Sequence, residues 1–138
     1  MSERSTNVAS YLLNTTVIIG YLRGHAEVRA RLHALAEQQH ELAVCAISVA
    51  EVFAGLRDED REATALFLST LAYFDVPFDI ARASGELQYA FARRGQTLKL
   101  TDVLIGASAL ARDAILLTDN VKDFALPGLQ VERLPSSR

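Results

Sequence analysis

The sequence has little cysteine, no long apolar run and no excess of basic residues, and each shortage excludes a class of protein. Cys45 is the only cysteine, so an intrachain disulfide and a cysteine-based zinc site are both excluded. No apolar run approaches the ~18 residues that a membrane-spanning helix requires. The polar segment 1–10 lacks the apolar core of a signal peptide. We therefore expect a cytoplasmic protein that does not associate with membranes.

The charge balance of the chain is slightly acidic. Lys and Arg number 14 against 17 Asp and Glu, which gives a formal net charge of −3. This excludes a protein that holds nucleic acid by bulk electrostatic attraction, but not a nuclease, whose catalytic centre needs acidic residues. The 138 residues, 50% of them hydrophobic, suffice for one globular domain. We predict a single domain over 1–138, with 1–10 a loose extension and 134–138 a tail.

Short apolar runs alternate with longer amphipathic segments along the chain, which is typical of an α/β fold with a mainly parallel sheet. Strands are expected at 11–13, 42–46, 75–78 and 115–118, with a possible fifth at 130–133. Helices are expected at 17–22, 26–39, 49–56, 80–94 and 103–111, and another opens within 57–62. Pro77 weakens the third strand and favours a place near the edge of the sheet.

Two acidic residues need an explanation. Glu51 has apolar neighbours on both sides, and a buried carboxylate is costly unless it is paired or binds a metal. Glu51 also lies three residues after Ser48, which is the spacing of a capping box at a helix start. Asp102 can simply complement the dipole of the helix that it opens. For each acid alone, the structural and the functional interpretation stay open.

Polar groups also follow the first and fourth predicted strands. Asn14 leaves the first strand, and residues 118–120 leave the fourth. Ligands usually bind beyond the carboxyl ends of parallel strands, so these groups meet if the two strands are neighbours. With Glu51 and Asp102 they form the kind of oxygen-rich set that Mg²⁺ or Mn²⁺ prefers. Such an ion can activate water for phosphodiester hydrolysis.

Four segments of the chain resemble, in order, the motifs of PIN-domain ribonucleases, and most closely those of the VapC toxins of bacterial VapBC toxin–antitoxin pairs. The segments are Tyr11-Leu-Leu-Asn14-Thr-Thr, Ser48-Val-Ala-Glu51-Val-Phe, Leu100-Thr-Asp102-Val-Leu and Leu117-Thr-Asp-Asn120-Val-Lys-Asp123-Phe. The resemblance extends over about residues 11–133.

This resemblance implies a three-layer α/β/α sandwich and a metal-dependent endoribonuclease with Mg²⁺ or Mn²⁺ as cofactor. It implies metal ligands at Asn14, Glu51, Asp102, Asp119 and Asp123, further catalytic positions at Asn120 and Thr118, and support of the acids by the Ser48 and Thr118 hydroxyls. Asp123 can equally cap a short turn. The resemblance also implies a homodimer, a cognate VapB-type antitoxin, and transfer RNA or ribosomal RNA as substrate.

Position 14 departs from the family pattern, in which the first motif normally reads Asp-Thr-Ser or Asp-Thr-Asn. Asparagine keeps the shape of aspartate but replaces an anionic oxygen with an amide donor, so we expect weak metal binding and low activity. Two explanations compete: a weakened natural member, or an aspartate exchanged so that a toxic enzyme could be produced. The intact Glu51 and Asp102 favour the exchange. The alternative function is a catalytically inactive module that binds RNA or a protein partner.

Basic residues just before Asp102 are weaker candidates, for contact with RNA. Arg93, Arg94 and Lys99 could contact RNA phosphates beside the metal site, although the two arginines also suit a helix C-terminus. Arg23 and His25 are weaker candidates for the same role.

Two further patterns have structural explanations. His33, Glu37 and His40 have a spacing that could hold zinc, but the helix is otherwise charged, so a plain solvent-facing surface is preferred. A set of apolar residues fits core packing, a dimer face or a groove for an antitoxin helix. The set is Leu66, Leu68, Leu71, Tyr73, Phe74, Leu87, Tyr89 and Phe91.

Overall fold

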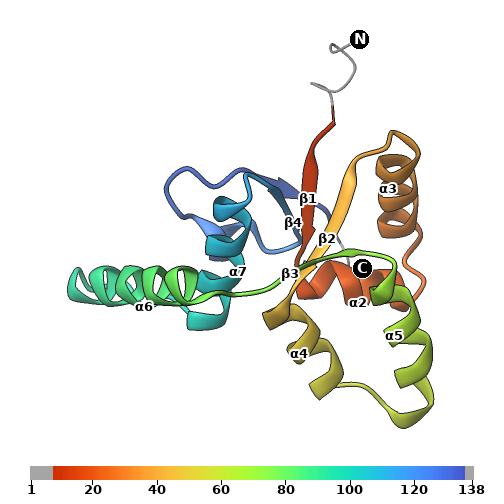
Figure 1. Cartoon of the computed structure of the whole chain (residues 1–138), viewed down its shortest axis with the longest axis horizontal. Helices are drawn as coiled ribbons and strands as arrows, with labels where there is room; N and C mark the ends of the chain where they lie inside the picture. The colour runs from red at the N-terminus through yellow and green to blue at the C-terminus, as the bar shows by residue number, and fades with distance from the viewer. Residues whose placement is uncertain (1–7, 136–138) are drawn as a thin grey trace.

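A five-stranded parallel sheet forms the centre of the molecule (Figure 1). The computed structural model describes residues 8–135. The strands are β1 (Ser10–Leu13), β2 (Glu41–Cys45), β3 (Ala72–Phe74), β4 (Ile115–Thr118) and β5 (Val131–Arg133), in the order β3-β2-β1-β4-β5. Every neighbouring pair is parallel, which confirms the predicted α/β fold and its sheet.

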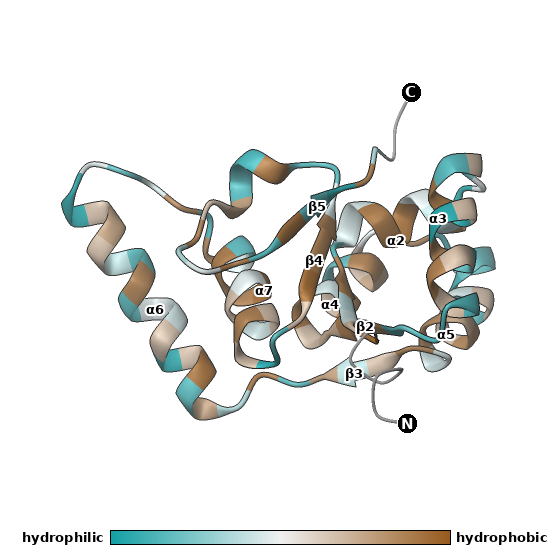
Figure 2. Cartoon of the chain, turned by 90° about the horizontal axis from the view of Figure 1, so that it is seen from above, coloured by the Kyte–Doolittle hydropathy of each residue, from teal (hydrophilic) through white to brown (hydrophobic). Residues whose placement is uncertain are grey.

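Helices connect the strands. They are α2 (Thr15–Leu22), α3 (Ala26–Glu37), α4 (Ala46–Ala54), α5 (Arg61–Ser69), α6 (Phe78–Arg93) and α7 (Leu100–Ala111), with short 3-10 turns η1 (Asp58–Asp60) and η2 (Val121–Phe124). Helices α2, α3 and α5 lie on one side of the sheet, and α6 and α7 lie on the other (Figure 2). Within residues 8–135, no helix has the length and apolarity of a membrane span.

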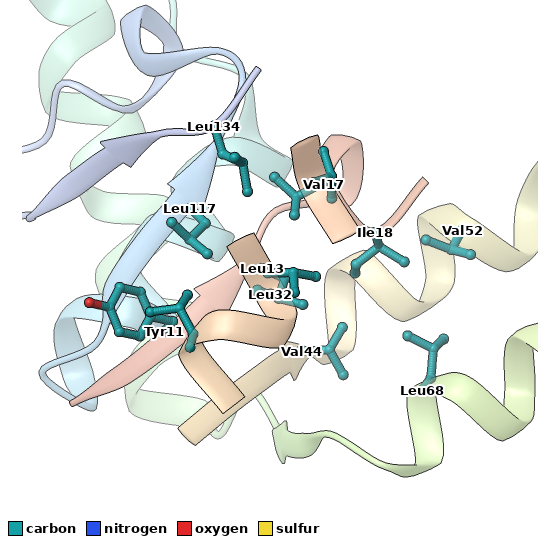
Figure 3. Packing of buried hydrophobic residues seen from close by; sticks show 12 residues of the cluster. Tyr11, Leu13, Val17, Ile18, Leu32, Val44, Val52, Leu68, Leu117 and Leu134 are labelled. Atoms are coloured by element: carbon teal, nitrogen blue, oxygen red, sulfur yellow. The ribbon is translucent and has the colours of Figure 1, made fainter. Parts of the chain in front are cut away.

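Alternate strand residues enter two separate cores, because successive side chains of a strand point to opposite faces. Tyr11 and Leu13 pack in a first cluster with residues of α2, α3, α4 and α5 (Figure 3). Leu12 packs in a second cluster with Ile105 and Ala109 of α7. Both faces of the sheet are therefore covered, as in the predicted three-layer sandwich, and this explains why the strands read as continuous apolar runs.

The set of apolar residues for which core packing, a dimer face or a groove was predicted is partly buried and partly exposed. Leu68 and Phe74 are buried in the first and second clusters, respectively. Leu66, Tyr73 and Tyr89 are exposed. Core packing thus accounts for only part of this set.

The third strand was predicted three residues too late. It covers Ala72–Phe74 rather than 75–78, and Pro77 precedes α6 as its N-cap residue. Proline has no N–H to donate to a strand ladder, whereas its fixed φ suits the entry to a helix. The predicted edge position is nevertheless confirmed, because β3 pairs only with β2 among the described strands.

The capping-box interpretation of Ser48 and Glu51 is wrong. Helix α4 begins at Ala46, so Ser48 lies inside its first turn and the capping box does not form. Helix α2 begins at Thr15, with Asn14 as its N-cap residue. Both helices start directly after their strands, which frees these polar side chains for contacts between elements.

The predicted loose ends fall partly outside the described residues, at 1–7 and 136–138. At the inner limit of the N-terminal extension, the Ala9 carbonyl accepts a hydrogen bond from the Glu41 N–H (2.9 Å), and Ser10 opens β1. At the other end, Leu134 is buried and donates its N–H to the Thr118 carbonyl (2.9 Å). That residues 1–138 form one domain stays a prediction.

Candidate active site

A cavity of about 330 Å³ lies at the carboxyl edge of the sheet. Its lining residues come from the end of β1 and from helices α2, α4 and α7 and the 3-10 turn η2. Two further lining residues directly precede α7 and η2. The lining residues are Asn14, Thr15, Thr16, Glu51, Lys99, Asp102, Asn120, Asp123 and Phe124. Because β1 and β4 are hydrogen-bonded neighbours, Asn14 and Asn120 meet here, as the sequence predicted.

Asn14 is held by its backbone between β4 and α2. Its N–H donates to the Leu117 carbonyl (2.9 Å), and its own carbonyl accepts from the Val17 and Ile18 N–H groups (3.0 and 3.1 Å). The side chain is only 5% exposed. The position of the amide is therefore set by the sheet and by the first turn of the helix.

The Asn14 amide nitrogen is directed at threonine hydroxyls. Nδ2 donates to Thr118 Oγ1 (2.9 Å) and to Thr16 Oγ1 (3.4 Å). Buried Thr118 Oγ1 also accepts from the Asn120 N–H (3.0 Å), so it links the ends of β1 and β4. The amide nitrogen is engaged by these two hydroxyls, and the carbonyl oxygen Oδ1 is the atom left for a ligand.

Glu51 is oriented by a hydroxyl group. Thr15 Oγ1 donates to Glu51 Oε1 (2.6 Å) and lies 3.0 Å from Ser48 Oγ, within hydrogen-bond distance. Ser48 is fully buried. The hydroxyl that contacts the acid is therefore that of Thr15, and Ser48 contacts Thr15. Sequence reasoning missed that role, since the only available signal was that Thr15 directly follows Asn14.

Asp102 lies in the first turn of α7, where burial raises the pKa of its carboxyl above the usual range. The negative charges of Asp123 and Glu51 also raise this pKa, whereas the Lys99 ammonium lowers it. The carboxylates therefore repel one another across the cavity. A cation among them would relieve that repulsion.

The structure does not bring every predicted residue to the cavity. Asp119 lies outside its lining, and Asp119 Oδ1 is 3.8 Å from Arg133 Nη2 of β5. The structure therefore does not bring Asp119 to the cavity lining, and its role as a metal ligand stays a prediction. Phe124 and Thr16 line the cavity although sequence reasoning did not single them out.

The predicted basic patch divides in the same way. Lys99 lines the cavity, but Arg93 and Arg94 do not. Their guanidinium carbons lie 5.5 Å from the Tyr89 ring centre and 4.7 Å from the Phe91 ring centre, respectively. The structure therefore places the two arginines against aromatic rings outside the cavity lining, and their contact with RNA stays a prediction.

A larger cavity of about 460 Å³ lies between α2, α4 and α5. Its lining is mostly apolar, and it includes Arg23, which was a weak candidate for phosphate contact. The lining residues are Ile19, Leu22, Arg23, Glu51, Val52, Gly55, Leu56, Arg57, Asp60, Ala63 and Thr64. Glu51 lines both cavities, so they meet at this carboxylate.

The histidines of α3 and the turn after it have other partners. His33 Nε2 and the Tyr21 hydroxyl are 2.9 Å apart, and His40 Nδ1 accepts from the Ala9 N–H (3.0 Å). His33 and Glu37 are exposed. The preferred interpretation, a solvent-facing surface rather than a zinc site, agrees with these contacts.

A family model of the PIN domain matches residues 11–126. The chain belongs to the PIN-domain family. Ribonuclease VapC19 from Mycobacterium tuberculosis is 33% identical over 120 residues, which span 86% of this chain and 96% of the relative.

Solved structures give the same result for this PIN domain. It matches the crystal structure of VapBC2 from Rickettsia felis bound to a promoter DNA fragment, with a TM-score of 0.78. The two sequences are 27% identical, and the match covers 91% of this chain and 98% of that chain. It also matches a toxin–antitoxin complex from Klebsiella pneumoniae, with a TM-score of 0.72 and 30% identity over 86% of this chain and 94% of that one.

The acidic side chains of this PIN domain do not form a compact metal-binding cluster in the described part of the chain. Among residues 8–135, no three His, Cys, Asp or Glu side chains form a group that could hold a metal ion. Position 14, in the cavity lining, supplies an amide oxygen instead of a carboxylate. The donors are nevertheless the hard oxygens that Mg²⁺ and Mn²⁺ prefer. They fit an ion that keeps several of its waters and binds few carboxylates directly.

Proposed function

We propose that the protein is the toxin of a toxin–antitoxin pair and an endoribonuclease that hydrolyses RNA with a divalent cation. The observation that carries this function is the cavity where Asn14, Glu51, Asp102 and Asp123 converge. It occurs in a chain that is 33% identical to a protein named a ribonuclease. Transfer RNA or ribosomal RNA is the expected substrate, and the cytoplasm is the expected location.

The residues that would hold Mg²⁺ or Mn²⁺ are Asn14, through Oδ1, and the carboxylates of Glu51, Asp102 and Asp123. Such an ion, when bound, lowers the pKa of water and neutralises charge on the phosphate. Thr15 keeps Glu51 oriented, and Thr118 keeps Asn14 oriented. In the net reaction, the oxygen of water is added to phosphorus, the bond from phosphorus to one ribose oxygen breaks, and that oxygen takes the proton.

An antitoxin is the proposed protein partner. The larger cavity offers an apolar surface between α2, α4 and α5, and it reaches the acidic cavity at Glu51. An antitoxin segment bound there can place a basic side chain beside the acids. A homodimer is also proposed, and the exposed Phe78 and Tyr89 of α6 offer apolar surface for it.

The test compares the chain with its Asn14→Asp variant, each purified free of antitoxin. Total bacterial RNA is incubated with each protein in Mg²⁺, Mn²⁺ or EDTA, and the products are separated by gel electrophoresis. We expect Asn14→Asp to cleave RNA with either metal and not in EDTA, and the parent chain to cleave more slowly. Adding Asp102→Ala to Asn14→Asp should abolish cleavage, which controls for a contaminating nuclease. No metal-dependent cleavage by Asn14→Asp would contradict the proposal.

The alternative is a non-catalytic module that binds RNA or a protein, and the amide at position 14 is the observation that favours it. This function predicts that the parent chain and Asn14→Asp bind RNA equally in Mg²⁺ and in EDTA. Fluorescence anisotropy with a labelled RNA measures this directly. Metal-independent binding without cleavage by either protein would establish the alternative.

A further inference from the structure

Lys99 is the one cationic residue among the described residues that line the acidic cavity. We propose that its ammonium group binds the scissile phosphate of the RNA and supplies the positive charge that a second divalent ion would otherwise supply. The inference deepens the endoribonuclease function proposed above and rests on it. It assigns this chain one resident divalent ion.

The backbone of Lys99 is fixed at the rim of the cavity. Its carbonyl accepts a hydrogen bond from the Val103 N–H (3.0 Å) at the start of α7. The carbonyl of the preceding Leu98 accepts from Gln88 Nε2 of α6 (2.8 Å). The backbone is therefore anchored between two helices, while the side chain is exposed.

The Lys99 ammonium forms no ion pair with a carboxylate of the described residues. All ion pairs found within residues 8–135 involve arginine, and none joins Lys99 to a carboxylate. Lys99 nevertheless lines the cavity together with the three carboxylates. An ammonium that lines the cavity and has no ion-pair partner among the described residues is available to a phosphate.

The neighbouring arginines cannot take this role in the described arrangement. Arg93 donates from Nη1 to the Tyr89 hydroxyl (3.1 Å) and lies over its ring, and Arg94 lies over Phe91. Neither lines the cavity.

The charges around the cavity favour a single divalent ion. Glu51, Asp102 and Asp123 contribute three negative charges, Asn14 contributes none and Lys99 contributes one positive charge, so the formal sum of the lining is −2. Without RNA, one divalent ion neutralises this sum, whereas a second ion would leave an excess of two positive charges. Two-metal sites are instead clamps in which both ions stabilise the attacking and leaving oxygens.

The experiment compares Lys99→Gln with Lys99→Arg and with Lys122→Gln. Lys122 is the other lysine of the sequence, is exposed, and lies outside the cavity lining, so its removal is a matched loss of one charge. Mn²⁺ binding without RNA is measured by electron paramagnetic resonance of the free ion. Cleavage of total bacterial RNA is measured over a range of Mn²⁺ concentrations, with Asn14 and with Asn14→Asp.

Lys99→Gln is expected to change the two measurements in opposite directions. Mn²⁺ should bind several-fold tighter, because the formal charge of the lining falls from −2 to −3. Cleavage should slow by about 10- to 100-fold, because the phosphate loses its cation, and its dependence on Mn²⁺ should become steeper. Lys99→Arg should retain most of both properties, and Lys122→Gln should change neither by more than about twofold.

Three outcomes would overturn the inference. If Lys99→Gln weakens both Mn²⁺ binding and cleavage, the residue is structural. If cleavage slows while Mn²⁺ affinity is unchanged, Lys99 attracts RNA from outside the cavity. If neither changes, it has no role in the site. Should no variant cleave RNA, the ribonuclease function and the phosphate role fail together, whereas tighter Mn²⁺ binding by Lys99→Gln would still place its charge in the cavity.

Discussion

The two cavities that meet at Glu51 differ in chemistry more than in size. The smaller one, of about 330 Å³, is lined by acids, amides and hydroxyls from segments far apart in the sequence. The larger one, of about 460 Å³, has aliphatic side chains of α2, α4 and α5 in its lining beside charged residues. Convergent polar groups mark a reaction site, and apolar surface marks a binding site. The larger cavity is therefore not the better candidate for catalysis.

The two cavities also differ in how their polar groups are held. Asn14 and Glu51 are fixed by hydrogen bonds from or to threonine hydroxyls of other elements. Arg57, at the larger cavity, has a side chain that is 72% exposed and pairs only with Glu59 and Asp60 nearby in sequence. Preorganised groups suit chemistry that tolerates little misplacement, whereas mobile rim charges suit recognition of a partner.

The largest expected effect comes from the residue that both cavities share. Glu51→Gln in the Asn14→Asp protein should reduce RNA cleavage by about 10²- to 10³-fold, because it removes a carboxylate from the proposed metal site. Glu62→Gln, on the exposed side of α5, is the matched control and should leave the rate within about twofold. Initial rates with Mn²⁺ measure both. Equal rates for the two variants would remove Glu51 from the catalytic set.

A smaller effect is expected when the orientation of Glu51 is disturbed. Thr15→Val removes the hydroxyl that donates to Glu51 Oε1 (2.6 Å) and should lower Mn²⁺ affinity by about 10- to 100-fold. Thr15→Ser keeps the hydroxyl and should retain most of the affinity. If the serine variant loses as much affinity as the valine variant, packing rather than the hydrogen bond explains the effect.

The repulsion within the acidic cavity can be measured through stability. Since the pKa of Asp102 is raised in the folded protein, its contribution to stability is full below the pKa of the unfolded chain and is lost as the pH rises through the folded pKa. At neutral pH, in EDTA, Asp102→Asn should raise Tm by about 1–3 °C. Asp58→Asn, whose side chain is fully exposed, should change Tm less. A lower Tm for Asp102→Asn would contradict the proposed repulsion.

The smallest effect on cleavage is expected at the larger cavity. Ala63→Glu places a charge on an exposed position of its lining, on α5, which contributes no residue to the acidic cavity. We expect cleavage within about twofold of the parent and about tenfold weaker capture of the co-expressed antitoxin. A strong loss of cleavage by the folded variant would show that the two cavities are not separate in function.

Periodicity and turn residues predicted most of the fold. Residues 115–118 were identified correctly as β4, because three apolar residues and a threonine lie between a helix end and two polar residues. The third strand was misplaced because residues 71–78 carry two short apolar groups around Asp75, and their pattern does not show which group pairs with β2. The pairing depends on contacts with Ala43 and Cys45, which local sequence does not reveal.

The sequence predicted most residues of the candidate site, but not how their side chains are oriented. Asn14, Glu51, Asp102 and Asp123 were identified from motif order, and the structure gathers them around one cavity. Asp119 was identified in the same way but lies outside the lining, near Arg133 of β5, and the sequence pattern did not reveal this neighbour. Thr15 was missed because its partner Glu51 lies 36 positions away.

The sequence by itself determined the chemistry of this protein: an α/β chain whose oxygen donors suit a hard cation, with an amide at position 14. The tertiary structure alone decided how those donors can be used. Thr118, 104 positions from Asn14, directs the amide nitrogen away and leaves the oxygen for a ligand. The structure also separates Lys99 from Arg93 and Arg94. Hydrogen bonds and charge interactions act over a few ångströms, so only folding determines which distant residues come close enough to interact.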